Sequence, residues 1–361
     1  MKQHNFSAGP SILPIPVLQK ASEAVLDLNQ TGLSILEISH RSPNFINIIN
    51  EARALTKEIL NIPESYEVLF LQGGASLQFY MSALNMSKLN GTGAYIDTGT
   101  WSTKAIKESE KLGNTTTIAS SRDQAYKYIP KNISSNKPFD YLHFTSNNTI
   151  YGTQFHDFSK LSKLANNNNA KLICDMSSDI LSKKIDVELF DLIYAGAQKN
   201  IGPAGATLVI VKKNILQKNP NLPTYLNYQT HIDKESMFNT PPVFSIYVAM
   251  LTLKWIKRLG GLSAIESKNR EKSTTLYNEI DRNLLFSGLV EVTDRSMMNV
   301  TFKLNNENLE TKFNTMCQDA GISGLNGHRS VGGYRASLYN ALDIESVHVL
   351  IKIMQQLEKI S

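Results

Sequence analysis

Residues 171–205 read KLICDMSSDILSKKIDVELFDLIYAGAQKNIGPAG, and this stretch decides the fold. Two short apolar runs in it, Lys171–Cys174 and Leu192–Ala195, have the composition of buried strands. Similar runs lie elsewhere in the chain, at Glu67–Leu71, Ala94–Asp97, Tyr141–Thr145 and Thr207–Val211. Helical stretches alternate with these runs, and the alternation predicts an α/β fold whose mostly parallel central sheet is covered on both faces.

Amphipathic helices are expected before and after this region. Apolar residues recur at helical spacing in Pro16–Leu28 and between Phe45 and Ile59, and Phe244–Leu259 is a strong helix that ends at two glycines. The pattern then changes to an α+β arrangement, with strands at Leu289–Thr293, Asn299–Lys303 and Arg335–Tyr339 and helices at Leu309–Ala320 and Ile344–Glu358. We therefore expect a large domain at 16–259 and a smaller α+β domain formed by residues 1–15 and 260–361.

The composition excludes several classes of protein. The 361 residues carry 37 Lys and Arg against 32 Asp and Glu, and a net charge of +5 is too small for a dedicated nucleic-acid-binding protein. Two cysteines, Cys174 and Cys317, argue against a disulfide scaffold or a zinc site and for a reducing compartment. No apolar run approaches the roughly 20 residues of a membrane helix, and MKQHNFSAGPSILP lacks the apolar segment of a signal peptide. We expect a cytoplasmic enzyme without a metal and without a membrane partner.

A glycine-rich turn follows the first predicted strand of the sheet. Residues 72–78 read QGGASLQ, and a helix is predicted to begin near Leu77. Free N–H groups at a helix start form an anion site, and two glycines allow a tight turn. The turn lacks the lysine and the spacing of a P-loop. Taken alone, it indicates either a phosphate site or an ordinary strand–helix connection.

Asp175 and Lys199 each follow a predicted strand, 24 residues apart. Ligands bind at the carboxyl ends of strands in open α/β sheets, and the small residues around Lys199 leave space for a bulky partner. Each residue alone has a commoner explanation, a helix-capping acid or a surface lysine. Together with an upstream phosphate turn, they fit pyridoxal phosphate, whose aldehyde reacts with a lysine and whose ring nitrogen pairs with an aspartate.

Seven motifs, spread from one end of the chain to the other, carry a resemblance to a known family. They are FSAGPSILP at 6–14, SHRS at 39–42, GGASLQF at 73–79, AGAQKNIGPAG at 195–205, MFNTPP at 237–242, GHRSVGG at 327–333 and RASLYNA at 335–341. With these motifs the chain resembles the phosphoserine aminotransferase family, class V pyridoxal-phosphate enzymes of fold type I. The lysine motif and FNTPP are its most specific parts.

The resemblance implies a role for each residue of the cofactor site. Lys199 would form the Schiff base, Asp175 would pair with the pyridinium nitrogen, and Trp101 would stack on the ring. Thr149 would bind near the ring hydroxyl. The phosphate would be held by Ala75, Ser76 and Gln198, and by Asn239 and Thr240 of the other subunit in a homodimer.

The resemblance also implies an anionic substrate pair, glutamate and phosphoserine with their 2-oxo acids. Arginine forks suit carboxylates and phosphates. Arg335 would bind the α-carboxylate, and two dipeptides, His40-Arg41 and His328-Arg329, would bind the distal anionic group. Some members have an arginine where this chain has Ser76, and some have a serine at the position of Ala8. Both departures bear on substrate preference rather than on the cofactor.

The expected reaction transfers the amino group between L-glutamate and 3-phosphonooxypyruvate, giving O-phospho-L-serine and 2-oxoglutarate. The family also acts on a 4-phosphonooxy precursor of vitamin B6, so a second role is expected. Two alternatives stay open at this point. One is another class V enzyme, such as a cysteine desulfurase or an alanine–glyoxylate aminotransferase. The other is a basic nucleic-acid-binding module, although no Lys/Arg stripe interleaved with aromatic residues occurs.

Overall fold

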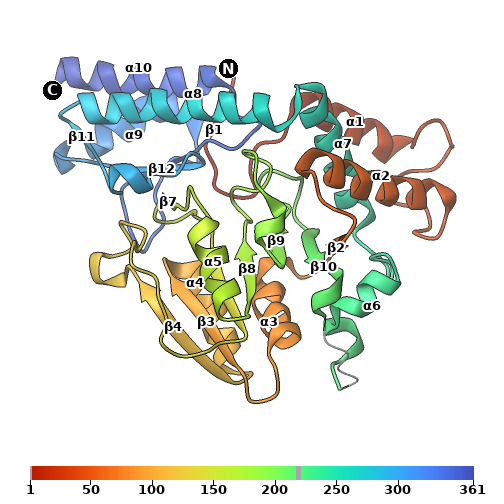
Figure 1. Ribbon diagram of the computed structural model, residues 1–361. Coiled ribbons are helices and arrows are strands. Elements are labelled where there is room, and N and C mark those ends of the chain that lie inside the picture. Colours follow the sequence, from red (N-terminus) through yellow and green to blue (C-terminus); the bar gives the residue numbers. More distant parts are fainter. Residues whose placement is uncertain (1, 217–220) are drawn as a thin grey trace.

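The computed structural model describes residues 2–216 and 221–361, and its centre is a seven-stranded sheet (Figure 1). Its strands are β2 (Tyr66–Leu71), β3 (Thr92–Asp97), β4 (Asn114–Ser120), β5 (Tyr141–Thr145), β8 (Lys171–Asp175), β9 (Leu192–Gly196) and β10 (Thr207–Lys212). Their order is β2-β10-β9-β8-β5-β3-β4. β10 runs antiparallel to both of its neighbours, and the other pairs are parallel. The predicted α/β class with a mostly parallel sheet is confirmed.

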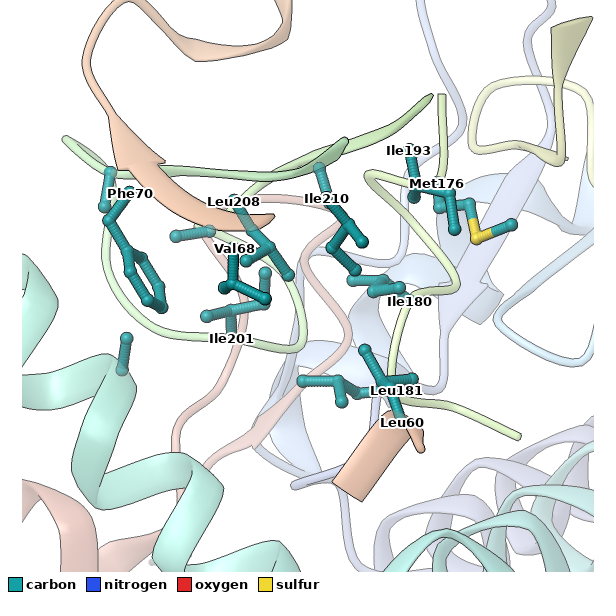
Figure 2. Close-up of a cluster of buried hydrophobic side chains, with 14 of the residues drawn as sticks. Leu60, Val68, Phe70, Met176, Ile180, Leu181, Ile193, Ile201, Leu208 and Ile210 are labelled. Carbon is teal, nitrogen blue, oxygen red and sulfur yellow. The ribbon is translucent and has the colours of Figure 1, made fainter. Parts of the chain in front are cut away.

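Side-chain alternation along the strands builds a separate apolar core on each face of the sheet. In β2, Val68 and Phe70 join one core, whereas Leu69 and Leu71 join the other. Helices α1 (Ile15–Leu26), α2 (Pro43–Leu60), α5 (Ser159–Asn167) and α7 (Val243–Arg258) contribute to the first core. Helices α3 (Gly74–Met86), α4 (Thr100–Glu110) and α6 (Tyr228–Asp233) contribute to the second. Figure 2 shows part of the first core, where Val68, Leu208 and Ile210 of the sheet gather with Ile180 and Leu181.

A third apolar core lies in the C-terminal part of the chain. Its antiparallel sheet contains β11 (Phe286–Gly288), β12 (Asn299–Leu304) and β14 (Tyr334–Ser337), and its helices are α8 (Gly261–Arg282), α9 (Glu310–Asp319) and α10 (Ile344–Ile360). Phe6 joins this core, and β1 (His4–Asn5) pairs with β13 (Ile322–Ser323). Figure 1 shows α8 running along the top of the molecule beside α10.

Helix α8 connects the two parts of the molecule. Leu262 and Ile265 near its start are buried in the first core, whereas Leu276 and Ile280 near its end are buried in the third. The remaining small sheet pairs β6 (Asn147–Asn148) with β7 (Thr153–Gln154). Among the described helices, none combines the length and the apolar character needed to cross a membrane.

Three elements differ from the sequence-based expectation. The strand predicted at Leu289–Thr293 is wrong, because β11 ends at Gly288 and Val292–Asp294 forms a short 3-10 helix. Strand β4 was not expected because it is an edge strand whose threonines are half-exposed and form no apolar run. Helix α8 was not expected because its sequence is mostly polar, and its apolar residues are too few to show a clear helical pattern.

Candidate active site

The site lies where β8 and β9 end, at the carboxyl edge of the parallel strands. Asp175 is the last residue of β8, and Lys199 lies in the turn that follows β9. Because the two strands are paired, the structure brings both side chains to the same place. The Lys199 Nζ donates a hydrogen bond of 2.8 Å to Thr149 Oγ1, just after β6. The structure therefore places Asp175 and Lys199 at the ends of neighbouring strands.

Lys199 is buried, and burial is the largest cause of its altered acidity. The cost of burying an ammonium group, together with the charge on Arg335, lowers the pKa of Lys199 to about 8. The carboxylates of Asp175 and Asp179 act in the opposite direction. An amine with this pKa is partly neutral near physiological pH, which makes it a competent nucleophile toward an aldehyde.

Asp175 keeps one carboxylate oxygen available. Its Oδ1 accepts hydrogen bonds from the Ser177 backbone N–H at 2.9 Å and from Ser177 Oγ at 2.6 Å. No donor among the described residues reaches its Oδ2. Burial raises the pKa of Asp175, while the Ser177 hydrogen bonds and the charge on Lys199 oppose that rise. A positively charged N–H group beside Oδ2 would satisfy this buried carboxylate.

Trp101 forms one wall of the site from the first turn of α4. Its ring centroid lies 6.0 Å from Lys199 Nζ, and its buried Nε1 has no hydrogen-bond partner within the described part of the chain. The turn before it is fixed by Ser102, whose Oγ accepts from the N–H groups of Thr98 and Gly99. Gly99 is required there, since a Cβ would lie 2.7 Å from Asn148 Oδ1.

The glycine-rich turn forms the expected helix start. Gly73 is the N-cap of α3 with a φ of 90°, so Ala75 and Ser76 lie in the first turn, where backbone N–H groups have no helical acceptor. Ala75 is half-buried and Ser76 is exposed. Gln198, the other predicted phosphate contact, folds back over Gly196, where a Cβ would lie 2.7 Å from its Oε1.

Asn239 and Thr240 lie in an exposed loop near the same turn. Gln72 Nε2 donates a hydrogen bond of 2.6 Å to the Thr240 carbonyl within this chain. Both side chains of the Asn239-Thr240 pair are exposed. The loop is therefore held by its backbone, and its side chains are left for another contact.

Of the predicted anion-binding residues, Arg335 is the one brought close to the lysine. Its buried Nε has no partner among the residues described, and burial lowers its pKa. The other four lie in loops, at His40, Arg41, His328 and Arg329. The guanidinium groups of Arg41 and Arg329 are exposed and unpaired with respect to the described residues. In one chain, these two arginines are not assembled around Lys199.

Sequence reasoning missed several residues that complete the site. The N-terminal loop packs on the lysine, since Ser11 Oγ donates to the Lys199 carbonyl at 2.5 Å and its N–H donates to the Gln198 carbonyl. Asp179 is a second buried acid, and its carboxylate accepts from Ser146 Oγ and Gln154 Nε2. The motif DMSSD, with its two acids four residues apart, was the available signal for Asp179.

Comparison with known proteins identifies the family of the chain. The family model described as "Aminotransferase class-V" matches residues 3–350. A "Phosphoserine aminotransferase" of Flavobacterium psychrophilum is 56% identical over 360 residues, which cover 99% of both chains. The solved phosphoserine aminotransferase of Bacillus circulans subsp. alkalophilus is 43% identical with a TM-score of 0.94, covering 99% of both chains.

A further solved structure concerns the cofactor. It is the "PLP bound phosphoserine aminotransferase" of Trichomonas vaginalis, which is 33% identical with a TM-score of 0.91 and covers 98% of this chain and 100% of its own. The sequence matches extend over nearly the whole length at identities well above those at which only the fold is shared. The chain belongs to the class-V aminotransferase family.

Proposed function

We propose that this protein is a pyridoxal 5'-phosphate-dependent phosphoserine aminotransferase. It transfers the amino group between L-glutamate and 3-phosphonooxypyruvate, giving O-phospho-L-serine and 2-oxoglutarate. The observation that carries this proposal is the buried Lys199 amine, with its lowered pKa, beside Asp175, Trp101 and Arg335. The names of the full-length relatives support the choice of substrates.

The residues present fit the cofactor. Asp175 has a carboxylate oxygen without a donor, Trp101 offers an aromatic face, and the α3 N-terminus offers free N–H groups. When bound, pyridoxal phosphate supplies an aldehyde that exchanges amino groups and a ring that accepts electrons. Lys199 would hold the aldehyde carbon, Asp175 the ring nitrogen, and Ala75, Ser76 and Gln198 the phosphate.

The protein's own groups would then handle binding and proton transfer. Arg335 would bind the α-carboxylate that both substrates share, because its buried Nε needs an anionic acceptor. The Lys199 amine, once free, would take the proton from the substrate α-carbon and return it as general acid and base. Thr149, which accepts from Nζ at 2.8 Å, would fix the direction of the amine.

The distal anionic group would be bound by loops that a single chain leaves open. Arg41 and Arg329 are exposed, together with His328, and His40 is half-buried. We assign these four residues to the distal phosphate or carboxylate in a homodimer whose subunits share their sites. Asn239 and Thr240 would reach the partner's cofactor phosphate in the same assembly.

The alternative of a cysteine desulfurase lacks its nucleophile. That chemistry needs a reactive cysteine in an accessible loop, because the thiolate is the attacking species. Cys317 is buried in α9, and burial raises its pKa to about 12. Cys174 lies inside β8, and burial raises its pKa as well. Neither thiol is poised to react.

Three further assignments accompany the proposal. We divide the chain into a large domain at 16–259 and a small domain formed by residues 1–15 and 260–361. The separate apolar core of the C-terminal part supports this division. Residues 1 and 217–220, which fall within these ranges, lie outside the described residues. The cytoplasm as the location and the vitamin B6 precursor as a second substrate stay predictions.

A spectroscopic experiment tests the assignment. Addition of glutamate to the purified holoenzyme should change the absorbance of the bound cofactor and release one equivalent of 2-oxoglutarate. Subsequent 3-phosphonooxypyruvate should restore the spectrum and yield phosphoserine. K199A should show neither change while keeping the wild-type circular dichroism spectrum, and the exposed-site variant K163A should behave as wild type. If serine or alanine is used as efficiently as phosphoserine, the substrate assignment is wrong.

A further inference from the structure

Asp97 is a buried acid that the proposed mechanism does not use. It ends strand β3, just before the turn that begins α4. Its Oδ1 accepts from Thr103 Oγ1 at 2.9 Å and lies 3.1 Å from Ser102 Oγ. Its Oδ2 accepts from the Tyr126 hydroxyl at 3.2 Å and from Arg122 Nη2 at 3.1 Å. One oxygen thus binds the first turn of α4, and the other binds the segment that follows β4.

We propose that Asp97 is a positioning residue that holds the first turn of α4 so that Trp101 faces the cofactor. The inference rests on the proposed function, in which the Trp101 ring stacks on pyridoxal phosphate. Asp97 precedes Trp101 by four residues. The partners of its Oδ1 directly follow the tryptophan. The carboxylate therefore closes a short loop of chain that contains the indole.

Gly99, the N-cap of α4, cannot hold this turn with a side chain. It has no oxygen to accept from the first N–H groups of the helix. A larger residue is excluded, because a Cβ would lie 2.7 Å from Asn148 Oδ1. The turn is instead closed by the Ser102 hydroxyl, whose Oγ accepts from the N–H groups of Thr98 and Gly99 at 2.9 and 3.0 Å.

Asp97 completes the hydrogen bonding of this turn. The Ser102 hydroxyl reaches two acceptors, the Gly99 carbonyl at 2.7 Å and Asp97 Oδ1 at 3.1 Å. The Thr103 hydroxyl reaches the same two acceptors, at 3.0 and 2.9 Å. The Gly99 carbonyl has two lone pairs, and one already accepts from the Thr103 backbone N–H. It can take one hydroxyl proton, so Asp97 Oδ1 takes the other. Without the carboxylate, one of these hydroxyls loses its acceptor.

Removal of Asp97 would not leave a buried cation without a partner. The Arg122 side chain is 64% exposed, so water can solvate its guanidinium when the carboxylate is absent. Arg122 also keeps its bond to Tyr126, whose hydroxyl accepts from Nε at 2.8 Å. The cost of D97A should therefore fall on the hydroxyl groups that the carboxylate binds, two of which belong to the α4 turn.

The same turn is tied to the segment that carries Thr149. Asn148 Nδ2 donates to Thr98 Oγ1 at 3.0 Å, and the hydroxyls of Thr100 and Tyr151 lie 3.2 Å apart. A shift of the turn would therefore move the indole relative to Thr149. Both groups are predicted cofactor contacts, so a displaced turn should weaken cofactor binding.

The test is the dissociation constant of pyridoxal phosphate, measured by titration of the cofactor-free protein and followed by the absorbance of the bound form. D97A should bind the cofactor about three- to tenfold more weakly, which is the range expected for one stacking contact. T103V retains the carboxylate and the packing but removes one donor to it, and it should show a smaller loss in the same direction.

Two matched variants serve as controls. Asp294 is as buried as Asp97 and also pairs with an exposed cation, Lys131, but its partners lie outside the α4 turn. D294A should lose stability to urea without losing cofactor affinity. Thr252 is buried on α7 and donates to the Val248 carbonyl, so T252V should bind the cofactor as wild type does.

A double-mutant cycle separates positioning of the ring from a general loss of structure. In a W101A background the ring is absent, so adding D97A should cause no further loss of affinity. Equal dissociation constants for D97A and wild type, equal losses in D97A and D294A, or additive losses in the cycle would each overturn the proposal. If D97A does not fold, T103V decides, and a wild-type affinity in T103V overturns the proposal.

Hydrogen exchange of the cofactor-free protein keeps this test independent of the proposed function. The N–H groups of residues 98–104 should exchange faster in D97A than in wild type, and at the wild-type rate in D294A. Unchanged exchange in D97A would overturn the role of Asp97. A wild-type protein that does not bind pyridoxal phosphate would instead contradict the proposed function.

Discussion

At the scale of single residues, the two acids beside the lysine have different tasks because their surroundings differ. Both carboxylate oxygens of Asp179 accept hydrogen bonds within the protein, one from Ser146 and one from Gln154. Asp175 has hydrogen-bond donors only at Oδ1, so it can accept from a ligand. The geometry therefore distinguishes two buried carboxylates that the motif DMSSD presents as equivalent.

Replacing Asp175 should separate cofactor binding from turnover. D175N should still bind pyridoxal phosphate, because the phosphate turn and Trp101 are untouched, but kcat should fall by about two orders of magnitude or more. An amide cannot stabilise a protonated ring nitrogen as a carboxylate does. Single-turnover kinetics with glutamate measure the effect, with D157N at an exposed position as the control. An unchanged rate would mean that another group holds the ring nitrogen.

The arginines should divide their work between the two ends of the substrate. R335A should reduce kcat/KM equally for glutamate and phosphoserine, because both present the same α-carboxylate to that residue. R41A should cost phosphoserine about 2–4 kcal/mol, roughly 30- to 1000-fold in kcat/KM, and glutamate less, because a phosphate dianion carries more charge. Steady-state kinetics with both substrates decide this, and equal losses in R41A would contradict the division.

Sequence could identify the central residues because chemistry and spacing coincide there. An aspartate and a lysine at successive strand ends can be recognised from the sequence alone, and so can a glycine-rich turn before a helix. Ser11 could not be identified in this way, because its contact with the Lys199 carbonyl joins residues that are far apart along the chain. The roles of Trp101 and Asn239 came from the family resemblance alone.

At the scale of elements, the apolar pattern predicts the strands buried on both faces and misses an edge strand and a mostly polar helix. The central strands β5, β8, β9 and β10 were predicted within a residue of their bounds, because each is a continuous apolar run. Strand β4 at the edge and the polar helix α8 carried no such signal. Helix α8 nevertheless holds Lys272, whose two hydrogen bonds fix the segment after β14.

The titration of Lys272 should make the free energy of unfolding depend on pH. Burial lowers its pKa to about 7 from the ordinary 10.5. Between these values the unfolded chain binds more protons than the folded one, so this group makes the free energy of unfolding rise with pH. In K272M that contribution is absent. Wild type should therefore gain stability relative to K272M, by up to about 1.4 kcal/mol per pH unit, as the pH rises above 7.

Urea unfolding at a series of pH values measures this difference. The exposed Lys312 of α9 provides the control, because its charge is not among the causes of the lowered Lys272 pKa, and K312M should follow the wild-type curve with a constant offset. Lys199 does not interfere, because its contribution is the same in all three proteins. Parallel curves for wild type and K272M would show that Lys272 keeps an ordinary pKa in the folded state.

At the scale of the whole molecule, the residues assigned to the site are only partly assembled in one chain. Lys199, Asp175 and Arg335 lie together, whereas the predicted distal-anion groups Arg41 and Arg329 stay exposed. The loop with Asn239 and Thr240 is held by Gln72 of the same chain, with its side chains exposed. In the proposed homodimer, a second copy of the chain would place these groups beside a bound cofactor or substrate.

Subunit mixing tests this arrangement. K199A lacks the reactive lysine, and N239A/T240A lacks the loop side chains, so each homodimer should be nearly inactive. In a mixed dimer, the subunit with Lys199 receives an intact loop from its K199A partner, and one of the two sites is complete. Random exchange of equal amounts should therefore restore about a quarter of wild-type activity. Mixing K199A with a K199A/N239A/T240A chain should restore none, because no subunit then carries the lysine. If exchange is verified by native mass spectrometry and activity stays at the level of the parents, the loop serves its own subunit's site, as its hydrogen bond to Gln72 would allow.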